Sequence, residues 1–173
     1  MNDFGVVTEA GSVRFERVLP GPIERVWSFL TDSDKRGQWL AAGTMDLRPG
    51  AKVELVFDNS KISKETEAPP EFKSFSGRHT TIWYVVRCEK PRLLVCTWPM
   101  QIGETELTFE LSERGKDVLL VLTHRRLDRA TMLMVGPGWH SHLGIMEDRL
   151  RGVEPRPFWT TFATTRKEYE KRV

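Results

Sequence analysis

Two of the four histidines, His140 and His142, lie two residues apart in the stretch MVGPGWHSHLGIMEDRL. On a helix this spacing turns the two side chains roughly 200° apart. A helical zinc site instead needs histidines four residues apart with a glutamate between them. The spacing therefore predicts no metal site. We expect His142 to line a pocket or to pack in the core, because it shares an apolar stripe with Trp139, Leu143 and Met146.

A third histidine, His124, ends the inward face of the alternating segment VLLVLTHRRL. It is either a hydrogen-bonded histidine at the rim of the sheet or a polar anchor for an oxygen atom of a ligand. His79 is expected to be exposed, and Ser141 has no Gly-x-Ser-x-Gly elbow around it. We therefore predict no catalytic residues and favour a binding protein. The alternative is a cyclase or hydrolase that uses His124, His142 or an inward-facing Arg87.

Composition excludes several classes of function. The 173 residues include 26 basic and 24 acidic side chains, which are interleaved, so a nucleic-acid footprint is not expected. No apolar run reaches the roughly 20 residues that a membrane span needs, and the first residues do not resemble a signal peptide. Two cysteines are too few for a disulfide scaffold, which favours a cytoplasmic protein. No motif indicates a metal or another cofactor.

The first third of the chain predicts one strand and two short helices. The segment SVRFERVLPGP reads as a strand that begins at Ser12 and ends at Pro20. A second, shorter helix, capped by Asp32 or Ser33, is expected to end near Trp39. The first helix is indicated by apolar residues at helical spacing: Ile23, Val26, Trp27 and Leu30.

The middle of the chain has the two-residue period of strands. Five segments alternate or are rich in β-branched and aromatic residues: AKVELVF, GRHTTIWYVVRC, RLLVCTW, TELTFELSE and VLLVLTHRRL. Short turns join most of them, which predicts an antiparallel sheet with one buried face. The polar segment 58–74 reads as a long surface loop.

Helical periodicity returns near the C-terminus. We expect Gly136-Pro137-Gly138 to form a turn and a helix to begin around Trp139. The segment RGVEPRP interrupts that helix, and a second helical stripe starts at Phe158. A long amphipathic helix is the natural cover for the apolar face of a bent sheet.

This order of elements resembles the SRPBCC superfamily, also called START-like or helix-grip proteins. It is most similar to a bacterial branch related to the C-terminal domain of the activator of the heat-shock protein 90 ATPase. The resemblance runs from about Ser12 to Arg172. It is carried by LPGPIERVWSFLTDSDKRGQWL, LLVCTW, TELTFEL, VLTH and GWHSHL, and by FWTTFATTRKEYEKR at the end.

The resemblance implies an α+β fold: a curved antiparallel sheet of about six to seven strands wrapped around a long C-terminal helix, with two short helices after strand 1. Residues 1–11 would be an N-terminal extension, and residues 12–173 a single START-like domain. It also implies a hydrophobic cavity between the sheet and the helix that binds a small hydrophobic or lipid-like ligand. The alternative is a regulator of the heat-shock chaperone with a role in the stress response.

The residues expected to wall this cavity are apolar or aromatic, with two histidines as polar contacts. The protein would be a monomer or a homodimer, with no stable membrane insertion. The predicted cavity residues are Trp39, Val53, Leu55, Phe57, Trp83, Val85, Trp98, Leu107, Phe109, Leu120, Leu122, His124, Trp139, His142, Leu143, Met146 and Phe158.

Overall fold

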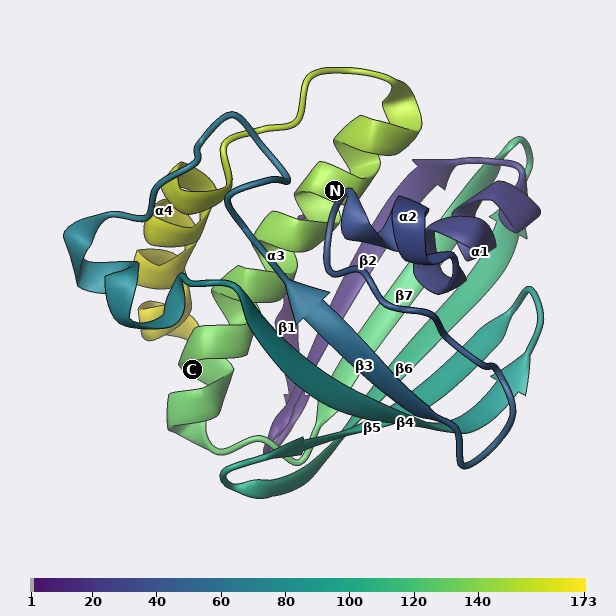
Figure 1. The fold of residues 1–173 in the computed structure, drawn as a ribbon, viewed down its shortest axis with the longest axis horizontal. Helices are drawn as coiled ribbons and strands as arrows, with labels where there is room; N and C mark the ends of the chain where they lie inside the picture. Colours follow the sequence, from purple (N-terminus) through teal and green to yellow (C-terminus); the bar gives the residue numbers. More distant parts are fainter. Residues whose placement is uncertain (1) are drawn as a thin grey trace.

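Seven strands form one antiparallel sheet in the computed structural model, which describes residues 2–173 (Figure 1). Their order across the sheet is β1-β2-β7-β6-β5-β4-β3. The sheet curves around one long helix, which confirms the predicted α+β helix-grip fold. The strands are β1 (Val6–Glu9), β2 (Ser12–Pro20), β3 (Lys52–Phe57), β4 (His79–Glu89), β5 (Leu93–Met100), β6 (Gly103–Arg114) and β7 (Asp117–Arg125).

The edge strand β1 lies within the segment expected to be an N-terminal extension. It pairs with β2, with Val6 opposite Arg14 and Val7 opposite Val13. All four residues of β1 are exposed. The strand therefore adds backbone hydrogen bonds to the sheet but little apolar burial.

Two short helices follow β2, as the sequence predicts: α1 (Ile23–Thr31) and α2 (Ser33–Gly37). The side chain of Asp32 caps α2 by accepting hydrogen bonds from the backbone N–H groups of Asp34 and Lys35, at 3.0 and 3.1 Å. Asp32, rather than Ser33, is therefore the N-cap. The predicted apolar stripe of α1 is buried at one end of the sheet.

The long helix α3 (Arg129–Arg151) begins well before Trp139. The prediction that residues 136–138 form a turn is wrong, because they lie inside α3. The true start is set by Asp128, whose carboxylate accepts a hydrogen bond from the backbone N–H of Thr131 at 2.7 Å.

The Gly-Pro-Gly sequence has a packing role within α3. Gly136 lies under the ring of Tyr169, and a Cβ atom added there would stand 3.2 Å from that ring. Gly138 faces open space, where an added Cβ atom meets nothing within 4 Å. The carbonyl of Pro137 accepts a hydrogen bond from the Ser141 hydroxyl at 2.8 Å. Tertiary packing thus overrides the local turn preference.

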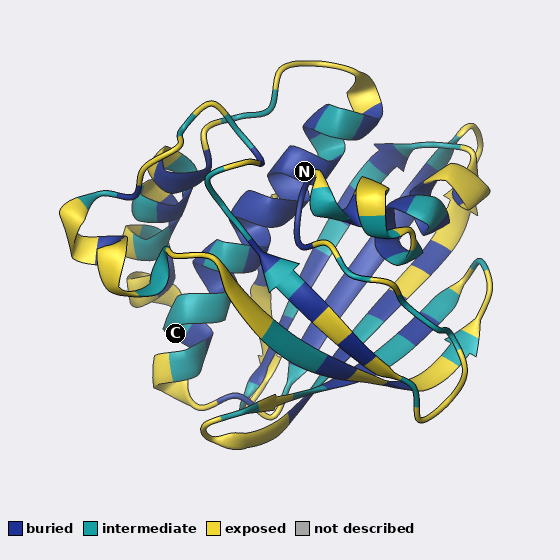
Figure 2. Ribbon diagram, viewed as in Figure 1, coloured by how far each residue is buried: buried dark blue, intermediate teal, exposed yellow. Residues whose placement is uncertain are grey.

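Helix α4 (Phe158–Arg172) packs against α3 on the side away from the sheet (Figure 1). Gly152 ends α3 in the left-handed conformation, with φ of 69°. The Pro-rich segment after it separates α3 from α4, as the interrupted stripe predicts. The inner face of the sheet and most of α3 are buried (Figure 2). The core therefore lies between the sheet and α3, and α4 closes one end.

A bulge in β4 changes which side chains point inward. Trp83 and Val85 are buried, as the alternation predicts. The register then shifts between Val85 and Arg87. Arg87 lies exposed and forms an ion pair with Glu89. The inward direction considered for Arg87 is wrong, because the extra residue of a bulge reverses the parity of the strand beyond it.

Candidate ligand-binding pocket

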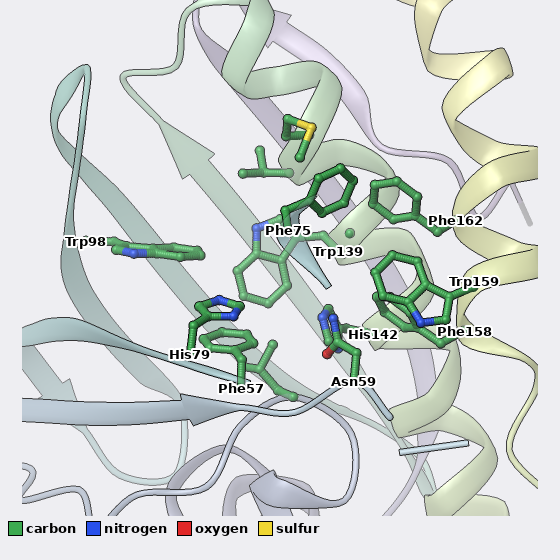
Figure 3. Close-up of a pocket in the computed structure, with 14 residues that line it drawn as sticks. Phe57, Asn59, Phe75, His79, Trp98, Trp139, His142, Phe158, Trp159 and Phe162 are labelled. Atoms are coloured by element: carbon green, nitrogen blue, oxygen red, sulfur yellow. The ribbon is translucent and has the colours of Figure 1, made fainter. Parts of the chain in front are cut away.

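An apolar pocket of about 210 Å³ lies where strands β3–β5 meet α3, α4 and the loop after β3 (Figure 3). Ligand sites for drug-sized molecules typically measure roughly 300–1,000 Å³. The pocket therefore suits a molecule of one or two rings.

Three nearly parallel rings form the sheet wall of the pocket. Phe57 in β3 lies opposite His79 in β4, and their rings stack with centroids 5.2 Å apart and planes 4° apart. The ring of Trp98 in β5 is 6.2 Å from that of Phe57, at 12°. Its indole N–H donates a hydrogen bond to the Thr81 hydroxyl at 2.8 Å. This hydrogen bond fixes the orientation of the Trp98 ring, and the three rings stack on one another.

Aromatic rings from both helices form the opposite wall (Figure 3). Phe158 and Trp159 are the first two residues of α4, and their rings pack edge to face with centroids 4.9 Å apart. Phe75 comes from the loop after β3, and its ring centroid lies 6.2 Å from that of Trp159 and 6.0 Å from that of Phe162. Trp139 projects from α3. The lining is completed by Leu40, Met134, Val135 and Gly138.

His142 is a polar group of the pocket with a defined protonation state. Its Nδ1 lies 2.6 Å from the carbonyl oxygen of Trp39. A carbonyl oxygen can only accept a hydrogen bond, so Nδ1 of His142 carries the ring proton and is the hydrogen-bond donor. Burial lowers the pKa of His142 to about 4, against a smaller opposing effect of this hydrogen bond. The ring is therefore neutral at pH 7, and Nε2, on its other edge, is a free lone-pair acceptor.

Asn59 supplies a second polar group, two residues beyond Phe57. Its Oδ1 is buried and has no hydrogen-bond partner among residues 2–173. A buried unpaired acceptor costs about 1–3 kcal/mol. No Lys, Arg, Asp or Glu side chain from the described part of the chain lines the pocket. The pocket is thus apolar with a few hydrogen-bonding groups and no formal acid or strong base.

The structure brings only some of the predicted cavity residues to this pocket. Those that line it are Phe57, Trp98, Trp139, His142 and Phe158. The others fill the packed interior outside it: Trp39, Val53, Leu55, Trp83, Val85, Leu107, Phe109, Leu120, Leu122, His124, Leu143 and Met146. Most of the concave face is therefore covered by its own side chains.

His124 lies behind the pocket and supports its walls. Its Nδ1 accepts a hydrogen bond from the indole N–H of Trp139 at 3.1 Å. Its Nε2 then carries the proton and donates to the Thr105 hydroxyl at 2.8 Å, and that hydroxyl donates to the Trp98 carbonyl at 2.9 Å. Burial lowers the pKa of His124 to about 3. Both ring nitrogens are occupied, so His124 orients Trp139 and leaves no nitrogen for a ligand.

His140 lies on a different side of α3 from the pocket. Its ring packs against the rings of Phe4 and Tyr169, with centroid distances of 4.7 and 6.2 Å. Burial is the main cause that lowers its pKa to about 4. No group of three or more His, Cys, Asp or Glu side chains within residues 2–173 is placed to hold a metal ion.

The loop after β3 contributes residues that sequence reasoning missed: Asn59, Phe75 and, at its end, His79. A short 3-10 helix in the loop (Pro70–Phe75) carries Phe72, which packs on Trp159 and Phe162 of α4 at 6.0 and 5.0 Å. The polar composition of the segment concealed this docking. The aromatic residues near the end of the loop and in α4 were the sequence signal that could have indicated this contact.

Two loop side chains cap the N-terminus of α4, which has no cap of its own. The Ser63 hydroxyl accepts a hydrogen bond from the backbone N–H of Phe158 at 3.2 Å. The Glu65 carboxylate accepts one from the backbone N–H of Thr160 at 2.9 Å and another from its hydroxyl. The loop is therefore clasped to α4 beside the pocket.

Replacing Glu65 with alanine should lower the free energy of unfolding by about 1 kcal/mol, the usual cost of losing a helix N-cap. Limited proteolysis should also cut the loop faster, because the hydrogen bonds from Glu65 that hold the loop to α4 are lost. Urea unfolding and a protease time course measure the two effects. Glu67→Ala is the matched control, since Glu67 is exposed in the same loop. Equal behaviour of both variants would show that the clasp contributes nothing.

A curved antiparallel sheet that grips a long helix, with an apolar pocket beside it, defines a protein of the helix-grip class. The chain belongs to the family described as Activator of Hsp90 ATPase homolog 1-like protein, whose model matches residues 20–151. No curated protein matches it. No helix within residues 2–173 is long and apolar enough to cross a membrane.

Solved structures agree with this family. A protein from Bordetella parapertussis is 45% identical; the match covers 99% of this chain and 91% of that one, with a TM-score of 0.85. CalU16 from Micromonospora echinospora is 24% identical over 93% of this chain and 87% of that one, with a TM-score of 0.70. DynU16, from the dynemicin biosynthetic locus, is 17% identical over 87% of this chain and 51% of that one, at 0.66. The last two show the fold alone.

Proposed function

We propose that this protein binds a small apolar molecule in the pocket between β3–β5, α3 and α4, without converting it chemically. The observation that carries the proposal is the pocket itself: about 210 Å³ of space walled by aromatic rings, within an interior that is otherwise packed. Such concave apolar sites with few polar groups are typical of small-molecule binding.

Gly138 offers a direct test, because it lines the pocket and an added side chain has room. Gly138→Leu should fill the pocket and weaken binding of the two-ring fluorescent probe 1-aminonaphthalene, which is uncharged at neutral pH, by tenfold or more. Folding should persist, because removing a glycine from a helix interior stabilises the helix by about 0.5–1 kcal/mol. Probe fluorescence and thermal unfolding measure the two effects.

Gly138→Ala is the matched control, since one methyl group leaves most of the space. It should keep most of the affinity and gain the same helix stability. If wild-type protein does not bind the probe, or if Gly138→Leu binds it as tightly as wild type, the proposal fails.

The family match supports a second candidate function, stimulation of the ATPase of a heat-shock protein 90 chaperone. Such a role would act through the protein surface and not through the pocket. An ATPase assay with the chaperone of the same organism separates the two functions. Stimulation that Gly138→Leu leaves unchanged would support the chaperone role, and no stimulation at saturating protein would remove it.

A further inference from the structure

The rim of the pocket is formed by the lining residues that reach the protein surface. A molecule that fills the pocket must pass their side chains. Most of them lie on a strand or on α3, where regular backbone hydrogen bonds hold each residue in place. Only Asn59 and Phe75 of this set come from the loop after β3. The residues of the rim are Asn59, Phe75, His79, Trp98, Met134, Val135 and Gly138.

The part of the loop that carries Phe75 is weakly tied to the rest of the backbone. Residues 63–77, here called the strap, run beside α4 (Figure 1). Within residues 2–173, no hydrogen bond between backbone groups joins the strap to the sheet or to a long helix. The chain just before the strap is anchored, because Ile62 is 1% exposed and its carbonyl accepts a hydrogen bond from Arg149 at 3.2 Å. Segments with so few backbone hydrogen bonds open at a lower cost in free energy than the core does.

Side chains hold the strap, and their main contacts lie on the first turns of α4. The Ser63 hydroxyl and the Glu65 carboxylate accept hydrogen bonds from backbone N–H groups of the first turn. The Phe72 ring packs on two aromatic rings of the same helix, with centroids 5.0 and 6.0 Å away. A further ion pair, Lys64 with Glu154, is exposed on both sides and contributes little. Because the main contacts share one helix end, we expect them to break together.

We propose that the strap is a gate for the pocket. Its release from α4 moves Phe75 off the rim, and this release sets the rate at which a ligand enters and leaves. The walls of the pocket determine the affinity, and the strap determines the speed of exchange. This inference rests on the proposed binding function and adds the control of ligand exchange to it.

Stopped-flow fluorescence with 1-aminonaphthalene tests the gate in Glu65→Ala. Glu65 accepts two hydrogen bonds from Thr160 and does not line the pocket. The association and dissociation rate constants should each rise about fivefold, the factor that the loss of one helix N-cap implies. Entry and exit pass through the same released state, so Kd should stay within about twofold of the wild-type value. Glu67→Ala, in the same strap, is the matched control and should keep the wild-type rates.

Phe72→Ala tests the aromatic contact of the strap independently of its hydrogen bonds. Phe72 is buried against α4 but does not line the pocket. Both rate constants should rise about tenfold or more, again with little change in Kd. Hydrogen–deuterium exchange without any probe should also be faster across residues 63–77 in Phe72→Ala and in Glu65→Ala, and unchanged in Glu67→Ala.

The outcomes separate the gate from the proposed binding function. If 1-aminonaphthalene does not bind to the wild-type protein, the binding function fails and the gate fails with it. If the probe binds and exchanges at wild-type rates in both Glu65→Ala and Phe72→Ala, the binding function stands and the gate is overturned. A weaker affinity without faster association would mean that the strap is a fixed wall, which also overturns the gate.

Discussion

Lowering the pH from 7 to 5 should reduce the free energy of unfolding by about 4–6 kcal/mol, because three buried histidines must stay neutral in the folded state. Burial lowers the pKa of His124 to about 3 and of His140 and His142 to about 4. In the unfolded chain a histidine titrates near pH 6.5. Between these values only the unfolded state takes up the protons.

The sign follows from this difference in bound protons. Well above a pH of about 6.5 neither state is protonated, and the stability is fully present. As the pH falls from about 6.5 toward 4, each histidine favours unfolding, by about 2 kcal/mol at pH 5. The three effects together approach the whole stability of a typical domain, roughly 5–15 kcal/mol.

The groups around His140 act in both directions. Arg17, Arg156 and Arg172 lower its pKa, and Asp3 raises it, but burial is the largest cause. For His124 burial is the only cause, and for His142 it outweighs the hydrogen bond to the Trp39 carbonyl. Burial therefore lowers the pKa of all three histidines.

Urea unfolding at several pH values between 7 and 5 measures the predicted loss. His140→Gln and His142→Gln should each reduce the loss by about 2 kcal/mol, after correction for the cost of each substitution at pH 7. A stability that does not change over this range would contradict the assignment of neutral buried histidines. So would a pH dependence that the two variants leave unaltered.

The strands and the grip on a central helix were predictable because apolar alternation is a local property. The apolar sides of β3, β6 and β7 follow directly from segments such as AKVELVF and TELTFELSE. The sequence-based predictions were wrong where contacts between residues far apart in the sequence determine the structure. The start of α3 depends on Asp128 and on Tyr169 above Gly136. The exposure of Arg87 depends on a bulge that no residue type announces.

The pocket was predictable only in part for a related reason. His142 and Trp139 follow from the helical stripe, but periodicity cannot tell a packed ring from one that faces space. Trp83 and Trp98 both face inward and lie 5.7 Å apart, yet only Trp98 lines the pocket. Asn59 and Phe75 enter because the loop docks on α4, a contact between residues far apart in the sequence.

Arg36 is the buried residue whose loss should disturb the fold and the pocket together. Only 1% of its surface is exposed. Nη1 donates hydrogen bonds to the carbonyls of Leu30 and Thr31, at 3.2 and 3.3 Å. Nε donates to Ala41 at 3.0 Å, and Nη2 donates to Gly43. One guanidinium therefore joins the end of α1 to the segment that follows α2.

The charge of Arg36 persists at neutral pH, since burial lowers its pKa only to about 10. Arg36→Met should cost about 3–5 kcal/mol of unfolding free energy, because it leaves four carbonyls without a donor. Arg36→Lys should cost nearly as much, since an ammonium group cannot span the four carbonyls as a planar guanidinium does. Urea unfolding measures both, with Lys35→Met as the control on the exposed neighbour.

The same substitution should reach the pocket through the segment that Arg36 holds. That segment includes Leu40, which lines the pocket, and Trp39, whose carbonyl accepts a hydrogen bond from Nδ1 of His142. Folded Arg36→Lys protein should therefore bind 1-aminonaphthalene more weakly than wild type, while Lys35→Met should bind it equally. Unchanged affinity in Arg36→Lys would mean that the pocket keeps its shape without this tether, and that the effect of Arg36 is confined to stability.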